Sequence, residues 1–399
     1  MNKWFLLAIS ALSAALLAAL LSALSPGEFW RGLAAFFVLV WPSVMILSAL
    51  WRWAGGGRGL AVLVALAFVL RLGVGVGLYL GLPAYGYPEP QQQAGYVFHD
   101  SYVRDTQAWE LAASDQSVLT GFSQDFIADQ YGGLLTLSAF LYRTLSPDAH
   151  RPLLVLVLTA FFGTLGVPFL WRLLRERLSP RAAWIGAVIF AFCPESLLLG
   201  GAQMREPFLI GFSAVGLWAA ANWKKGWRGS LLVLALSLSG AALISTRAAA
   251  PLAGVLAAWV WLDAYWPRMT GKARLAAWLG LGLLGVIIAG VSWGWLRSAG
   301  SWDTLLTLRN SGWVDKLFKE ILGERLILPF VVGYGLAQPV LPAAIFESTI
   351  PLWRGIAVAR ALGWYLLAPL LVYALFAVWR AEPKENRRWL LLLTAAGFV

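Results

Sequence analysis

The chain has 399 residues, of which 60% are hydrophobic and 13% charged, and a mean hydropathy of +0.71, which excludes an ordinary soluble domain. The net charge of +11 does not indicate nucleic-acid binding, because Lys and Arg gather in short segments between apolar runs, where they set membrane orientation. The single cysteine, Cys193, excludes an intrachain disulfide and a cysteine-based zinc site.

Apolar runs long enough to cross a bilayer, which needs about 20 residues, recur along the chain. They cover 4–24, 29–51, 60–81, 152–171, 182–200, 206–222, 229–246, 249–266, 275–296 and 356–379. We expect the first run to be an uncleaved anchor, since it is too long for a typical signal peptide. A last run begins near 388 and is cut off at Val399, so we expect a fragment of a longer protein.

Basic residues occupy alternate connecting segments, at 52–58, 172–181, 224–228, 268–274 and 380–388. The positive-inside rule places these segments in the cytoplasm. The alternation holds only if residues 131–145 do not cross, so we expect there a helix lying on the outer surface. Two long segments, 83–151 and 297–355, then face outward.

These patterns predict an all-α integral membrane protein in four parts. They are two N-terminal spans (1–59), a transmembrane core with the first outer loop (60–296), a second outer segment (297–355) and C-terminal spans of which the last is truncated (356–399). No internal repeat of fixed period is present, so an inverted-repeat transporter gains no support.

The first outer segment contains an acidic, helix-compatible stretch, His99–Ala112. Asp100 could serve a structural role, as an N-cap or in an ion pair with Arg104. The alternative is a general base, since partial desolvation makes a carboxylate a stronger base. Asp105 is a further candidate catalytic acid, but it lies about 140° further around a helix, so we do not expect both acids to face one substrate, and it also fits a solvated charge. Tyr102 and Trp109 are seven residues apart and share one face.

The stretch Asp100–Ala112 resembles the first outer-loop motif of the polyprenyl-phosphate-sugar-dependent glycosyltransferases of the GT-C superfamily. In that motif an acid and an aromatic residue precede a small, apolar helix of the form Ala-x-x-Leu-Ala. The superfamily includes protein O-mannosyltransferases, the aminoarabinose transferase of lipid A and, more distantly, oligosaccharyltransferases. Arg104 departs from the pattern, where an aromatic residue is expected.

Further segments are similar in order, spacing and sidedness. Residues 131–142 resemble the surface helix that closes the loop, 171–183 a cytoplasmic turn, 194–207 the next outer turn and 246–251 a later one. The similarity covers roughly 60–266 and, more weakly, 297–379. It implies a GT-C-type helical bundle whose two large outer loops bear surface helices.

The resemblance also implies residue roles. Asp100 becomes the catalytic base, and Glu206 orients the acceptor or the base, or is only a charge favourable to a helix N-terminus. Arg205 and Arg247 bind the leaving phosphate, or are interfacial arginines that snorkel. Arg71, deep in the third span, braces the core or the phosphate groove.

The remaining candidates lie in the outer loops. His99, Tyr102 and Arg104 belong to the substrate loop, although His99 and His150 fit ordinary surface residues better than ligands. Glu347 contacts donor or acceptor, or is a solvated loop charge.

We therefore expect an inverting glycosyltransferase in a bacterial inner or plasma membrane, with its active site facing outward. The donor is a sugar on polyprenyl phosphate, and the acceptor is a lipid, glycan or protein. No nucleotide-binding signature is present. Leaving-group stabilisation by arginine makes a cofactor unnecessary, and a divalent cation at Asp100 and Glu206 is the weaker option.

Three alternatives stay open. An O-antigen-type polymerase or ligase also has many spans and basic outer loops, and would tolerate Asp100→Asn. A lipid or sugar transporter would carry polar residues along a path near the bilayer midplane. A structural membrane scaffold leaves the polar loop unexplained.

Overall fold

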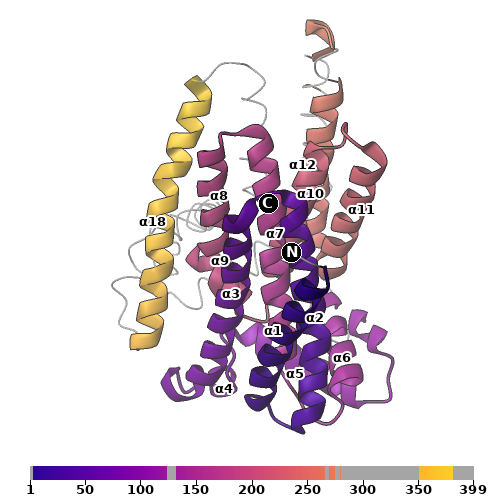
Figure 1. The fold of residues 1–399 in the computed structure, drawn as a ribbon, viewed down its shortest axis with the longest axis vertical. Helices are drawn as coiled ribbons and strands as arrows, with labels where there is room; N and C mark the ends of the chain where they lie inside the picture. Colours follow the sequence, from indigo (N-terminus) through magenta and orange to yellow (C-terminus); the bar gives the residue numbers. More distant parts are fainter. Residues whose placement is uncertain (1–2, 124–131, 266–268, 275–278, 280–349, 381–399) are drawn as a thin grey trace, which may run out of the picture. The chain divides into compact units, whose positions relative to one another are not determined.

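The computed structural model describes residues 3–123, 132–265, 269–274, 279 and 350–380, and among these the secondary structure is helical, without strands (Figure 1). The predicted all-helical class is confirmed for this part of the chain. The helices are α1 (Lys3–Ala23), α2 (Phe29–Ala54), α3 (Gly57–Tyr85), α4 (Pro90–Gln93), α5 (His99–Ala113), η1 (Val118–Phe122), α6 (Gly133–Leu145), α7 (Leu153–Arg177), α8 (Pro180–Phe192), α9 (Pro194–Gly200), α10 (Glu206–Ala221), α11 (Trp227–Ile244), α12 (Thr246–Tyr265) and α18 (Pro351–Arg380).

The chain divides into two compact units. Residues 1–260, 349–353 and 378–399 form the first, and 261–348 with 354–377 form the second. The packing described below belongs to the first unit. The predicted span 275–296 and the last apolar run lie outside the described residues.

Four described helices are long and apolar enough to cross a membrane: α2, α3, α7 and the Pro351–Tyr373 part of α18. The predicted span 182–200 is not one continuous helix. It is a pair of helices, α8 and α9, bent by 45°, because Pro194 cannot continue the backbone hydrogen bonding of α8. The apolar helices Leu7–Ala23, α10 and Arg228–Ile244 are shorter. Together these helices indicate a helical membrane protein.

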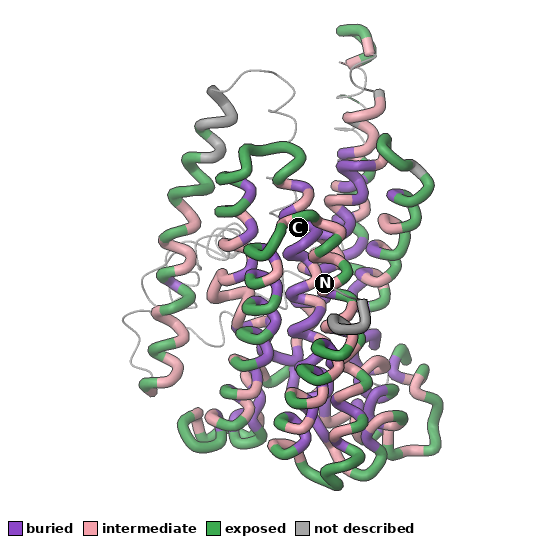
Figure 2. The backbone as a smooth tube through the Cα atoms, in the orientation of Figure 1, coloured by how far each residue is buried: buried purple, intermediate pink, exposed green. Residues whose placement is uncertain are grey.

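Helix α7 is the centre of the bundle. It is apolar around its whole circumference, and 78% of its most hydrophobic window is buried, as expected for a helix surrounded by others. It packs against α2, α3, α8 and α10 (Figure 2). At Gly211, α10 comes so close that a Cβ atom would lie 2.3 Å from the carbonyl oxygen of Phe162. Small residues permit such contacts between membrane helices.

The basic connections meet at one end of this bundle. Arg172 donates from Nη1 to the carbonyl oxygen of Trp53 at 2.6 Å, and Arg177 donates from Nη2 to that of Ala221 at 2.9 Å. Lys225 pairs with Glu176 at 3.0 Å. The segments 52–58, 172–181 and 222–228 are therefore on one side, which agrees with the alternation predicted from charge.

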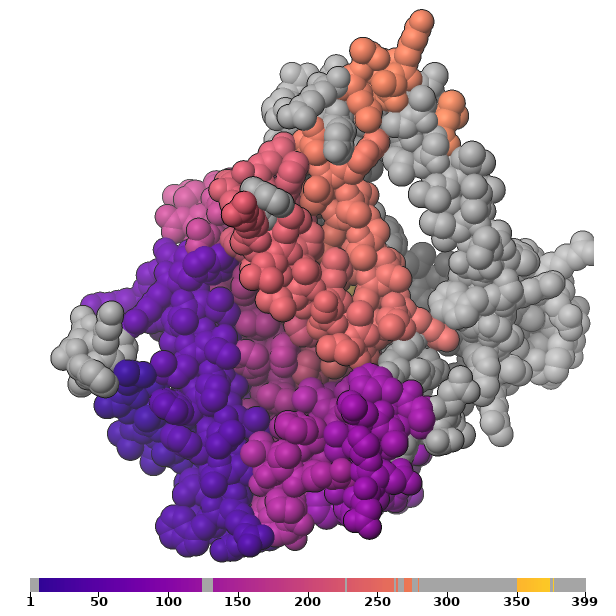
Figure 3. All heavy atoms as spheres, turned by 90° about the vertical axis from the view of Figure 1, so that its right-hand side faces the viewer, coloured from indigo at the N-terminus to yellow at the C-terminus, as the bar shows by residue number. Residues whose placement is uncertain are grey.

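Helices α5 and α6 lie together at the other end (Figures 1 and 3). Helix α6 has 13 residues and cannot cross a bilayer, so the prediction that this segment does not span is confirmed for residues 133–145. Its first residue, Gly133, abuts the carbonyl group of Leu243 at the end of α11. Arg143 caps the C-terminus of α5, donating to the carbonyl oxygens of Leu111 at 2.5 Å and Ser114 at 2.8 Å.

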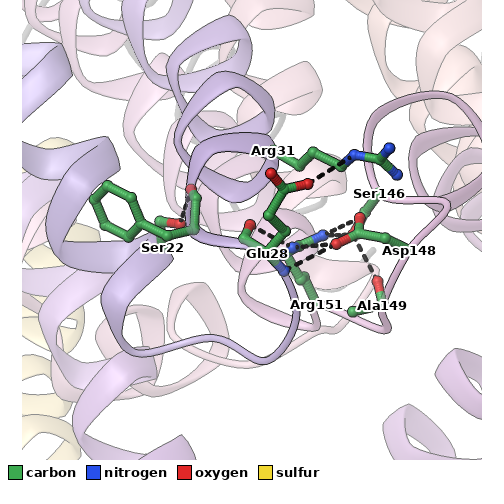
Figure 4. A network of polar contacts seen from close by, with 8 residues as sticks. Ser22, Glu28, Arg31, Ser146, Asp148, Ala149 and Arg151 are labelled. Atoms are coloured by element: carbon green, nitrogen blue, oxygen red, sulfur yellow. Dashed lines mark hydrogen bonds and ion pairs between the residues drawn. The ribbon is translucent and has the colours of Figure 1, made fainter.

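The buried side chain of Arg151 links the turn after α6 to the turn between α1 and α2 (Figure 4). Arg151 is fully buried and forms two 2.7 Å hydrogen bonds with the carboxylate of Asp148. It also donates to Ser146 Oγ at 2.6 Å and to the carbonyl oxygen of Glu28 at 2.9 Å. The hydrogen bonds from Arg151 hold the pKa of Asp148 well below its usual range. The α6–α7 turn is thereby tied to the α1–α2 turn.

Candidate active site

The first turn of α5 presents Asp100 to solvent. The N-cap of α5 is Phe98, and Asp100 lies inside the helix and is exposed. The predicted N-cap role of Asp100 is therefore wrong, because the helix begins earlier, at His99. A carboxylate in the first turn still interacts favourably with the helix dipole. His99 is exposed beside it.

The same turn contacts the loop that precedes α10. Ser101 donates from Oγ to the sulfur of Met204 at 3.2 Å, and Arg104 donates to the carbonyl oxygen of Gln203. Arg104, the predicted ion-pair partner of Asp100, is buried and points to this loop. We name the first turn of α5 together with residues 201–206 the α5–α10 site.

The loop of the α5–α10 site is held in place by backbone contacts. Gln203 donates from Nε2 to the carbonyl oxygen of Pro152 at the start of α7, at 3.0 Å. A Cβ atom on Gly201 would lie 2.7 Å from the backbone nitrogen of Gly75 on α3. Only glycine allows this approach, so the loop is fixed against two central helices.

Arg205 and Glu206 start α10 next to this contact. Arg205 is the N-cap residue and Glu206 lies in the first turn, both half-buried. Glu206 Oε2 is buried and has no hydrogen-bond partner within the described ranges. The structure therefore brings the helix of Asp100 to the loop of Arg205 and Glu206, two segments that the sequence placed in separate outer turns.

Two other predicted residues do not join this site. Arg247 is the second residue of α12 and is exposed, which fits its interfacial interpretation. Glu347 lies outside the described residues.

Arg71 is enclosed in the bundle. It is fully buried in α3, where it donates to Ser196 Oγ at 2.8 Å and to the carbonyl oxygens of Phe190 at 3.3 Å and Ala67 at 3.1 Å. Its side chain lies against Gly200, where a Cβ atom would come within 2.7 Å of Arg71 Cδ. These contacts favour the core-bracing interpretation of Arg71, because its guanidinium joins α3 to the α8–α9 bend.

Asp105 is the centre of a polar cluster that the sequence did not reveal. Its side chain is 2% exposed, so the prediction of a solvated charge is wrong. Its carboxylate accepts hydrogen bonds from Tyr96 Oη at 2.6 Å and Tyr142 Oη at 2.5 Å, and lies 2.8 Å from Nε2 of His150. Three donors satisfy a buried carboxylate, which explains why it is tolerated there.

Aromatic rings enclose the Asp105 cluster. The indole of Trp109 stacks on the imidazole of His150 at 5.2 Å and 19°, and Tyr102 lies edge-on to Tyr96 at 5.5 Å. The predicted shared face of Tyr102 and Trp109 is confirmed, since both flank this cluster. The side chain of His150 is 27% exposed, and it takes part in the cluster through its contacts with Asp105 and Trp109.

The two tyrosines are stabilised as neutral phenols. Burial raises the pKa of Tyr96 and Tyr142 well above the usual value, and the nearby charge of Asp105 raises it further. Tyr96 and Tyr142 therefore stay protonated across the physiological range, which suits a rigid support beneath the exposed Asp100.

No group of three or more His, Cys, Asp or Glu residues suitable for a metal ion occurs within the described residues. The pair expected to bind a divalent cation, Asp100 and Glu206, supplies at most two carboxylates. A hard divalent cation bound there would take the rest of its oxygen ligands from water or substrate.

Comparison with protein-family models, with curated proteins and with solved structures finds no match for this chain.

Proposed function

We propose that this chain is an integral-membrane inverting glycosyltransferase that moves a sugar from a polyprenyl-phosphate donor to an acceptor hydroxyl at the outer membrane face. The observation that carries the proposal is the contact between Ser101 and Met204 at 3.2 Å. It places the neighbours of these residues, Asp100 and Arg205, on adjoining elements at the end of the bundle opposite the basic loops.

Asp100 is the base in this proposal. It takes the proton of the acceptor hydroxyl, whose oxygen attacks the anomeric carbon of the donor sugar. The bond between that carbon and the phosphate oxygen breaks, and the lipid phosphate leaves with the electron pair. A single displacement inverts the anomeric configuration. Asp100 is exposed, rather than partly desolvated as the sequence predicted, so its suitability for this role rests on the access it gives to the acceptor.

Arg205 stabilises the charge that develops on the leaving phosphate, since guanidinium groups bind phosphate oxygens through paired hydrogen bonds. Arg247 is the second candidate for this contact. Glu206 orients the acceptor, or binds a divalent cation together with Asp100. His99, Tyr102, Arg104 and Glu347 complete the proposed substrate loops.

Asp105 is a positioning residue in this proposal. Its carboxylate is surrounded by three donors and is buried, so it does not touch the acceptor. It fixes α5 against α6 and the turn before α7, and thereby sets the direction of the first turn that bears Asp100. The lipid tail of the donor lies between spans, and the acceptor is a lipid, glycan or protein of a bacterial envelope.

The test is sugar transfer from polyprenyl-phosphate donors to envelope acceptors by purified protein. Asp100→Asn should lower the rate by about 100-fold or more, whereas Glu110→Gln, an exposed acid on the same helix, should leave it near wild type. Transfer that survives Asp100→Asn would remove Asp100 as base and favour the O-antigen-type polymerase or ligase. Movement of intact lipid or sugar across the membrane without transfer would favour the transporter.

A further inference from the structure

An apolar groove runs along the three N-terminal helices, away from the α5–α10 site. It has a volume of about 670 Å³, within the range of about 300–1,000 Å³ typical of sites that enclose small molecules. Its lining comes from α1, α2 and α3, namely Ser13, Leu16, Leu17, Leu20, Val44, Leu47, Ser48, Trp51, Ala61, Val64, Ala65, Phe68 and Val69.

The groove has a buried floor and an exposed rim. Leu47, Val64 and Phe68 form the floor and are each 4% exposed, whereas Leu16 and Val69 on the rim are 65% and 56% exposed. The two serines of the lining are the exceptions to its apolar character, and Ser13 is already bonded to the carbonyl oxygen of Ser10. The lining therefore suits a hydrocarbon chain.

Two positively charged residues, Arg52 and Arg58, lie at one end of the groove. Arg58 lies three and seven residues before Ala61 and Ala65, so it continues their face of α3. The guanidinium of Arg52 lies 5.8 Å from the centroid of the ring of Trp51, which lines the groove. Both arginines are exposed. They lie in the 52–58 segment, at the basic end of the bundle that the positive-inside rule assigns to the cytoplasm.

The two arginines flank the short α2–α3 turn. Gly55 and Gly57 adopt φ values of +72° and +63°, a backbone conformation that glycine adopts readily. Trp51 donates from Nε1 to the carbonyl oxygen of Gly57 at 2.6 Å, which closes the turn. A hydrocarbon groove ending in two cations matches a lipid with an anionic headgroup.

We propose that this groove binds one anionic phospholipid, with an acyl chain along α1–α3 and its phosphate beside Arg52 and Arg58. Charge complementarity between the two arginines and an anionic headgroup favours this occupant over the same groove of a second copy. The site is independent of sugar transfer.

The test is native mass spectrometry of the full chain released from detergent, with phosphatidylglycerol and phosphatidylcholine of identical acyl chains in equal amounts. One phosphatidylglycerol per chain should bind about 30-fold more tightly than phosphatidylcholine, the factor expected for two basic side chains at an anionic headgroup. Arg52→Gln/Arg58→Gln should abolish this preference. Arg31→Gln, an exposed arginine at the opposite end, should preserve it.

A second variant tests the groove itself. Ala65→Trp fills the groove and should lower the binding of both lipids at least 10-fold, whereas Val62→Trp, exposed on the same helix outside the lining, should not. Equal binding of the two lipids by wild type, or a preference that survives the double arginine variant, would overturn the proposal. A dimer that persists without bound lipid would overturn it in favour of a second copy. If Ala65→Trp does not fold, the lipid preference of the arginine variants tests the proposal.

Discussion

Oδ2 of Asp105 lies 2.8 Å from Nε2 of His150, although 45 residues separate the two in sequence. The contact joins α5 to the turn that begins α7. Asp105→Asn removes the charged acceptor that Tyr96, Tyr142 and His150 share. Because hydrogen bonds to a charged group contribute about 1.5–3 kcal/mol each, we expect a loss of at least about 2 kcal/mol in the free energy of unfolding. Thermal unfolding in detergent measures it.

The matched control is Asp115→Asn, an exposed acid just beyond the end of α5, which should change the unfolding temperature little. If Asp105→Asn unfolds at the temperature of the wild type, the Asp105 cluster does not support α5. Transfer by Asp105→Asn should fall less than transfer by Asp100→Asn wherever the variant is folded.

Gly200 makes room for Arg71. A Cβ atom at Gly200 would lie 2.7 Å from Arg71 Cδ and 2.8 Å from Cγ, and the fully buried arginine has no space to withdraw. Gly200→Ala should therefore destabilise the protein by about 1–3 kcal/mol. Gly73→Ala on α3, where nothing lies within 4 Å of the added atom, should be neutral or stabilising, because alanine favours a helix. Equal unfolding temperatures for the two variants would contradict the packing.

The Asp148–Arg151 pair should make stability depend on acid pH. Hydrogen bonds from Arg151 lower the pKa of Asp148 in the folded protein. The contribution of Asp148 to the free energy of unfolding is therefore complete above its unfolded pKa of about 3.9. It is lost as the pH falls through the lower pKa of the folded protein. Wild type should unfold at a higher temperature than Asp148→Asn at pH 7, and the difference should shrink below about pH 4. A difference that stays constant with pH would disprove the pairing.

The raised pKa values of Tyr96 and Tyr142 predict that the protein loses stability at alkaline pH. The pKa of both tyrosines in the folded protein exceeds the unfolded value of about 10. Their contribution to the free energy of unfolding is therefore complete below about pH 10 and is lost as the pH rises through the folded pKa. Absorbance of phenolate during alkaline titration should show two tyrosines that ionise later than the others. Their ionisation should coincide with unfolding. Tyr142→Phe should remove one of them.

The sequence predicted the helical class and the alternation of the basic segments, because hydropathy and charge are local properties. Basic segments such as 172–181 and 222–228 meet at one end of the bundle, as their alternation indicates. The bend at Pro194 was not predicted, although a proline stands inside that apolar run. Only the family resemblance gave Asp100, Arg205 and Glu206 a common site, since the sequence itself placed them in separate outer turns.

The Asp105 cluster was not predictable in the same way. Its partners Tyr142 and His150 lie 37 and 45 residues away, and no local pattern marks them as neighbours. Helical spacing put Asp105 on a different face from Asp100, which is correct. It could not show that this face is covered by α6, so the interpretation as a solvated charge was wrong.

The most direct test of the proposed function is the anomeric configuration of the product. Purified protein is given a polyprenyl-phosphate sugar of known β configuration and an envelope acceptor, and the product is examined by nuclear magnetic resonance. Direct displacement predicts an α-linked product from wild type and almost none from Asp100→Asn. A β-linked product, or transfer that does not depend on Asp100, would contradict the assignment.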